Sequence, residues 1–149
     1  MSEENVVKKR TTSLQRDRIT LELPVKPDYV MVVRLTTAAI MTRAGFNIDD
    51  IEDLKMAIAE AYTTIIRLYG QGDCVIEYQF EQGWTQISIN LKNYKSMTRD
   101  IDGSGVRPRT TTQEDELSSY IIHSIMDDVQ IFRQNGAVVG MTMVKGNGL

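Results

Sequence analysis

Residues 47–69 read NIDDIEDLKMAIAEAYTTIIRLY, and their spacing predicts one long amphipathic helix. Its apolar residues follow one another at intervals of three and four, so they share one face: Ile51, Leu54, Ile58, Ala61, Ile65 and Leu68. Asn47 suits the N-cap position, and the acidic residues after it lie near the positive end of the helix dipole. We expect Gly70 and Gly72 to end the helix.

A second stripe on the same helix lies beside the apolar face. Its members are also three and four residues apart: Asp53, Ala57, Glu60, Thr64 and Arg67. Two interpretations are open. The stripe is either the solvated flank of a core-packed helix, which is the usual role of charged residues, or a pocket wall formed by Glu60 and Thr64.

Composition restricts the class of protein. The 149 residues predict a polar, flexible tail at 1–16 and one domain over 17–149. A net charge of -3 argues against direct nucleic-acid binding. With no apolar run long enough to span a membrane and no signal peptide, we expect a cytoplasmic protein. The single cysteine, Cys74, is expected to be buried, and with the single histidine, His123, it cannot form a His/Cys zinc site; no metal is predicted.

The remaining patterns predict the other elements of the fold. They indicate a strand at 18–25, a helix at 27–44, strands at 74–80 and 86–91, a helix at 114–128, and a hairpin of 129–134 and 137–144. Residues 92–113 are expected to form a long polar loop. Because strands and helices do not strictly alternate, the order predicts an α+β two-layer sandwich, with a mostly antiparallel sheet and helices on one face.

Three segments resemble a known family: LELPVKPDYVMVVRLT (21–36), FNIDDIEDLKMAIAEAYTTII (46–66) and SIMDDVQIFRQNGAVVGMTM (124–143). They are similar to the anti-sigma factor serine kinases of the RsbW and SpoIIAB type, which belong to the GHKL ATPase superfamily. The resemblance implies the Bergerat (histidine kinase-like ATPase) fold. It also implies a homodimer whose partners are a sigma factor and an STAS-domain anti-anti-sigma protein.

The resemblance implies roles for two residues of the long helix. The family uses a glutamate as general base, and Glu60 matches it. Four residues later the family has an asparagine that holds magnesium, and Thr64 stands there. A threonine hydroxyl can ligate magnesium, but it is shorter and has no amide carbonyl.

The second nucleotide box of the family differs more. After the strand ending at Leu91, the family has an aspartate that accepts a hydrogen bond from adenine, and then a glycine. This chain has Leu91-Lys92-Asn93, and leucine cannot accept that bond. The segment Asp102-Gly103-Ser104-Gly105 is out of register and too far from the strand to replace it.

The third box of the family is a glycine-rich turn that cradles phosphates at the start of the last helix. The matching residues are Glu116-Leu117-Ser118-Ser119-Tyr120, so no glycine permits close backbone approach. Asp115 and Glu116 also place negative charge near the expected phosphates. At about 4 Å, each like-charge pair costs roughly 4 kcal/mol at an effective dielectric of 20.

The sequence therefore predicts a non-catalytic, RsbW-like regulator without a cofactor, in which Glu60 is a vestigial general base. Arg34 matches an arginine of the family's partner surface, although the pattern alone would make it an ordinary exposed charge. The alternative is an active serine/threonine protein kinase that uses ATP and magnesium. It would use Glu60 as base and Thr64 as ligand, and basic loop residues would neutralise the phosphates: Lys92, Lys95, Arg99 or Arg107. A scaffold that serves only oligomerisation is a third hypothesis.

Overall fold

A five-stranded antiparallel sheet forms one layer of the computed structural model, which describes residues 16–93 and 113–146. Its strand order is β1-β2-β3-β5-β4, and every neighbouring pair is antiparallel. The strands are β1 (Asp17–Pro24), β2 (Asp73–Glu81), β3 (Trp84–Leu91), β4 (Asp128–Gln134) and β5 (Ala137–Gly146). The helices are the 3-10 turn η1 (Pro27–Tyr29), α2 (Val30–Arg43), α3 (Ile48–Tyr69) and α5 (Gln113–Ile125).

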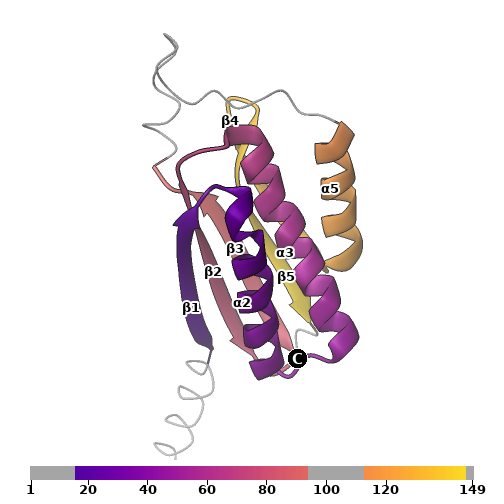
Figure 1. Ribbon diagram of the computed structural model, residues 1–149. Coiled ribbons are helices and arrows are strands. Elements are labelled where there is room, and N and C mark those ends of the chain that lie inside the picture. Colours follow the sequence, from indigo (N-terminus) through magenta and orange to yellow (C-terminus); the bar gives the residue numbers. More distant parts are fainter. Residues whose placement is uncertain (1–15, 94–112, 147–149) are drawn as a thin grey trace, which may run out of the picture.

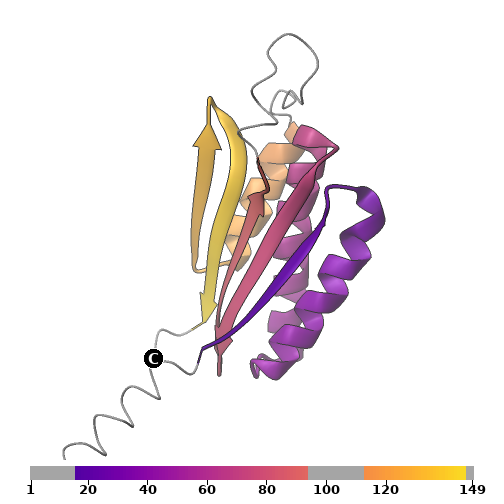
Figure 2. The same cartoon turned by 90° about the vertical axis from the view of Figure 1, so that its left-hand side faces the viewer.

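The three α-helices form the second layer and all lie on one face of the sheet, with α3 between α2 and α5 (Figures 1 and 2). Successive side chains of a strand point to opposite faces, so every second residue of β2 and β3 is buried beneath the helices. Tyr78 and Ile87 lie opposite each other in this buried set. The predicted α+β two-layer sandwich is confirmed.

Helix α3 is the central element of the core. Its N-cap is Asn47, whose side chain accepts the Asp50 backbone N–H at 2.8 Å. Its C-cap is Gly70, which has a φ of 66° and so the left-handed conformation that glycine adopts without strain. The predicted boundaries and apolar face of this helix are therefore correct.

Tyr62 of α3 is fully buried, and its hydroxyl fixes the connection that leads from β1 to α2. The hydroxyl donates to the Pro24 carbonyl at 2.6 Å and accepts the Lys26 backbone N–H at 3.2 Å. Burial raises the pKa of this tyrosine. The contact joins α3 to the β1–α2 connection, which lies 36 to 38 positions earlier in the sequence.

Some predicted boundaries are wrong by a few residues. The helix predicted at 27–44 begins with the 3-10 turn, and α2 starts only at Val30. The strands predicted at 74–80 and 86–91 extend to Glu81 and from Trp84, because Gly83 (φ 73°) permits a turn of only two residues. The last helix ends at Ile125, since the Asp127 N–H already donates to Val144 in the sheet. Residues 94–112 of the predicted polar loop lie outside the described residues. They include the segment Asp102-Gly103-Ser104-Gly105 and three of the four basic residues proposed to neutralise phosphates, Lys95, Arg99 and Arg107.

Candidate functional site

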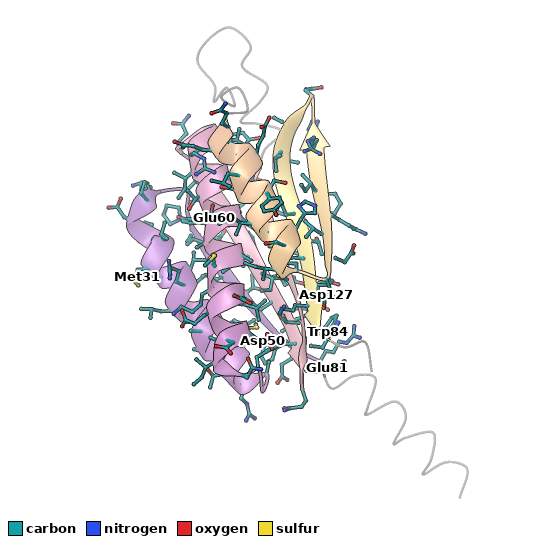
Figure 3. The ribbon with its side chains drawn as sticks, turned by 90° about the vertical axis from the view of Figure 1, so that its right-hand side faces the viewer. Met31, Asp50, Glu60, Glu81, Trp84 and Asp127 are labelled. Carbon is teal, nitrogen blue, oxygen red and sulfur yellow. The ribbon has the colours of Figure 1, made fainter. Side chains whose placement is uncertain are left out.

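The polar stripe of α3 faces α5 rather than solvent. Thr64 is buried, and Glu60 and Arg67 are partly buried at the α3–α5 boundary, where Figure 3 labels Glu60. The solvated-flank interpretation is therefore wrong for these three residues. It holds for Asp53, which is exposed near the start of the helix.

Four side chains form what we call the α3–α5 polar network: Glu60, Arg67, Asp115 and Ser118. The Ser118 hydroxyl donates to Glu60 Oε2 at 2.6 Å. Arg67 donates through Nη2 to Ser118 Oγ at 2.6 Å and through Nε to Asp115 Oδ1 at 2.8 Å. Ser118 and Asp115 are only 2% and 8% exposed. The Arg67 cation thus contacts the Asp115 carboxylate directly and reaches the Glu60 carboxylate through Ser118. Hydrogen bonds to ionised groups of this kind are about twice as strong as neutral ones.

The spacing of α3 predicts that Arg67 and Glu60 share one stripe, but the network itself is not predicted from the sequence. The resemblance placed the negative charges of Asp115 and Glu116 near the expected phosphates. The structure corrects this expectation, because the Arg67 guanidinium pairs with Asp115. Glu116 is exposed, and no ion pair with it is seen among the described residues.

A pocket of about 250 Å³ lies between α3, α5, β4 and β5. Its apolar lining comes from Leu68, Ile131, Val138 and Met141, and its polar lining from Thr64, Asp115, Glu116, Ser119 and Arg133. Thr64 therefore borders the pocket, as one interpretation of the stripe expected, whereas Glu60 is not among the lining residues. The Thr64 hydroxyl donates to the Glu60 backbone carbonyl at 2.9 Å, so its proton is already used within the helix.

The positions that match the second nucleotide box do not border the pocket. Leu91 is buried in the core and pairs with Cys74 across the sheet. Asn93 has a φ of 55° and stands where the family has glycine, and asparagine tolerates this left-handed conformation better than most residues. The turn is thus retained without the polar acceptor. Among the described residues, the Leu91 side chain cannot accept a hydrogen bond from adenine, and the Glu60 carboxylate already accepts the Ser118 hydroxyl.

Arg34 lies on the other side of the helical layer. It is partly buried on α2, which α3 separates from α5 (Figure 1). Met31 and Leu35 on the same helix are exposed, and Figure 3 shows Met31 on the outer side of α2. The structure therefore does not bring Arg34 together with the other predicted site residues.

Cys74 and His123 have the structural roles that the sequence suggests. Cys74 is buried, and burial raises the pKa of its thiol to about 12, so it is not a reactive thiolate. His123 is exposed, with Nδ1 2.8 Å from the Ser119 carbonyl of its own helix. Neither residue contributes to the network.

Comparison with known proteins identifies the family. The model of the histidine kinase-like ATPase domain matches residues 23–143. Similar proteins include serine-protein kinase RsbW from Bacillus cereus (strain AH187), Bacillus anthracis (strain A0248) and Bacillus thuringiensis (strain Al Hakam). Each is 35% identical over 136 residues, covering 85% of this chain and 84% of the relative. This chain belongs to the RsbW-type histidine kinase-like ATPases.

The match confirms the resemblance and the Bergerat fold. It runs from the end of β1 into β5, so α3 and α5 of this RsbW-type chain both lie within it. Across the described ranges 16–93 and 113–146, we find no helix that combines the length and apolar character needed to cross a membrane.

Proposed function

We propose that this RsbW-type protein is an anti-sigma regulator that binds its protein partner without binding ATP or acting as a kinase. The observation that carries the proposal is the 2.6 Å hydrogen bond from Ser118 to Glu60. The carboxylate that matches the family's general base is held by the protein's own hydroxyl, which is itself bonded to Arg67. Phosphoryl transfer depends on positioning and on electrostatic stabilisation of the nucleotide, and Leu91 and Thr64 supply neither the adenine acceptor nor the amide ligand.

The proposed partners are a sigma factor or an STAS-domain anti-anti-sigma protein, and the proposed contact surface includes Arg34. Met31 and Leu35 flank this arginine in sequence and expose apolar side chains on α2. Arginine beside exposed apolar side chains is typical of interface anchors. We propose that the protein acts in the cytoplasm as a homodimer, without direct contact with nucleic acid or membrane.

Calorimetric titration with ATP and ADP, each with magnesium, tests the loss of nucleotide binding. We expect no heat of binding up to millimolar nucleotide. Micromolar binding would contradict the proposal, because it would mean that other groups have replaced the eroded boxes.

Charge reversal of Arg34 tests the partner surface. Arg34→Glu should weaken capture of the sigma factor or STAS-domain protein encoded in the same genome, without a change in thermal unfolding. Arg43→Glu is the matched control, since Arg43 lies on the same helix and is exposed. Equal capture by both variants would remove Arg34 from the interface.

The alternative function is an active serine/threonine protein kinase that uses ATP and magnesium. Two observations favour it: Glu60 is retained, and Thr64 borders a pocket with one apolar wall. The relatives' name, serine-protein kinase RsbW, describes such an activity for those proteins.

A further inference from the structure

We propose that the α3–α5 polar network is an internal latch that holds the N-terminal half of α5 against α3 in the absence of any ligand. The inference deepens the proposed function and rests on its premise that no nucleotide binds. Arg67, a residue of α3, provides the electrostatic link to α5, so no ligand is needed for it.

The distribution of buried residues along α5 is the first argument. Ile122 is fully buried, and Met126 just beyond the helix is also buried, so the C-terminal half is anchored by apolar contact. The N-terminal half is different, because Leu117 and Tyr120 are 60% and 72% exposed. Its buried residues are Asp115 and Ser118, two members of the network.

The geometry of Arg67 is the second argument. The guanidinium donates to Asp115 and Ser118, and its Nη2 also lies 3.4 Å from the Glu114 carbonyl. The three partners are residues of the first two turns of α5. A planar guanidinium presents its donors in a fixed fork, so these contacts define both the position and the rotation of the helix.

The charge arrangement is the third argument. Arg67 pairs directly with Asp115, and Ser118 links Arg67 to Glu60. Asp115 is nearly buried, and an ionised carboxylate in such a position requires a partner. Breaking the Arg67–Asp115 pair by removing one member would leave a buried charge, which is the costly outcome for pairs of this type.

Asp115 also borders the pocket, so this residue belongs to both the network and the pocket. A ligand that needs α5 to move must break the network first. The position of α5 should therefore be independent of added nucleotide.

Hydrogen exchange of the full-length protein, followed by mass spectrometry, tests the latch. We compare the wild type, with and without millimolar magnesium ATP, with Arg67→Gln and Ser118→Ala. Arg18→Gln is the matched control, because Arg18 forms an exposed 3.7 Å pair with Glu77 far from α5. Peptides from β2 and β3 report whether each variant is folded.

We expect residues 113–120 to exchange slowly in the wild type, to be unaffected by magnesium ATP, and to exchange at least about ten-fold faster in Arg67→Gln. Ser118→Ala should have a smaller effect in the same peptide, since it removes two hydrogen bonds and no charge. Equal exchange of this peptide in Arg67→Gln and Arg18→Gln would overturn the latch. Should Arg67→Gln fail to fold, Ser118→Ala decides: an unchanged rate in 113–120 would overturn the proposal.

The two proposals fail separately. If calorimetry detects nucleotide binding while Arg67→Gln still loosens α5, the nucleotide-independent function is wrong. The contacts between α3 and α5 are then confirmed, but the claim that they act without a ligand fails. If no nucleotide binds and the α5 peptide does not respond to Arg67→Gln, the function stands and the latch is wrong.

Discussion

Glu60 and Tyr62 of α3 are only two positions apart and face opposite sides of the helix. The two side chains have different surroundings. Tyr62 faces the β1–α2 connection and is enclosed by the apolar core, where its hydroxyl satisfies backbone groups. Glu60 faces α5 and takes part in a chain of side-chain hydrogen bonds. Burial of the first face stabilises the fold, whereas the second face carries the polar chemistry.

The difference indicates which side of α3 tolerates substitution within an RsbW-type fold. Apolar burial is non-directional, so the core face requires only side chains of suitable size and shape. The α5 face depends on specific donors and acceptors, and a changed residue there needs a new partner. Ser118 supplies such a partner, because its hydroxyl donates to Glu60 and accepts from Arg67.

Truncation of Tyr62 should have the largest effect on stability. Tyr62→Ala removes a fully buried ring and the hydroxyl that donates to the Pro24 carbonyl, so we expect a loss of about 3–5 kcal/mol. Urea denaturation measures it. Tyr120→Ala, at an exposed position of α5, is the control and should change stability by less than about 0.5 kcal/mol. A similar loss of stability in both variants would mean that burial of the Tyr62 side chain does not explain its contribution.

High pH should destabilise the folded protein, because two ionisable side chains are buried in its core. Burial raises the pKa of Cys74 from 9.0 in the unfolded chain to about 12, and that of Tyr78 from 10.0 to about 12. Above pH 9 the unfolded chain releases the thiol proton while the folded chain keeps it, so stability falls as pH rises towards 12. The slope contributed by one such proton is about 1.4 kcal/mol per pH unit.

Cys74→Ala removes one of these protons and should flatten the alkaline loss of stability, although the variant is less stable at neutral pH because of the cavity. Urea midpoints from neutral to alkaline pH give the slope. A slope unchanged by the substitution would show that the Cys74 thiol is not what titrates.

The two sides of α3 also differ in how far the sequence predicts them. The helix and its core face follow from a regular spacing, a polar N-cap and a terminal glycine, which are local signals. The network joins residues 48 to 58 positions apart, so it depends on where α5 packs, and no local pattern contains that information. The spacing placed Glu60 and Arg67 on one stripe, but it could not show that Ser118 and Asp115 would meet them.

A double-mutant cycle should detect the coupling within the network. Arg67→Gln, Asp115→Asn and the double variant should give an interaction energy of about 1–3 kcal/mol, because the pair is largely shielded from water. The matched cycle on Arg18 and Glu77 should give no measurable coupling, since that pair is longer and exposed. Equal interaction energies in the two cycles would mean that the Arg67–Asp115 pair is no stronger than an exposed surface ion pair.

Glu60→Gln should have the smallest effect on stability and is the sharpest test of what the α5 side does. Glutamine keeps an oxygen that can accept the Ser118 hydroxyl, so we expect a loss of less than about 1 kcal/mol. A general base, in contrast, cannot be replaced by an amide, and a kinase that depends on Glu60 would lose its activity. Phosphorylation of an STAS-domain protein by the wild type that disappears in Glu60→Gln would establish the catalytic alternative. If neither the wild type nor Glu60→Gln phosphorylates the STAS-domain protein and both bind it equally, Glu60 serves only as a hydrogen-bond acceptor. The polar face of α3 would then hold α5 in place and have no catalytic role, in contrast to the kinase activity that the relatives' name describes.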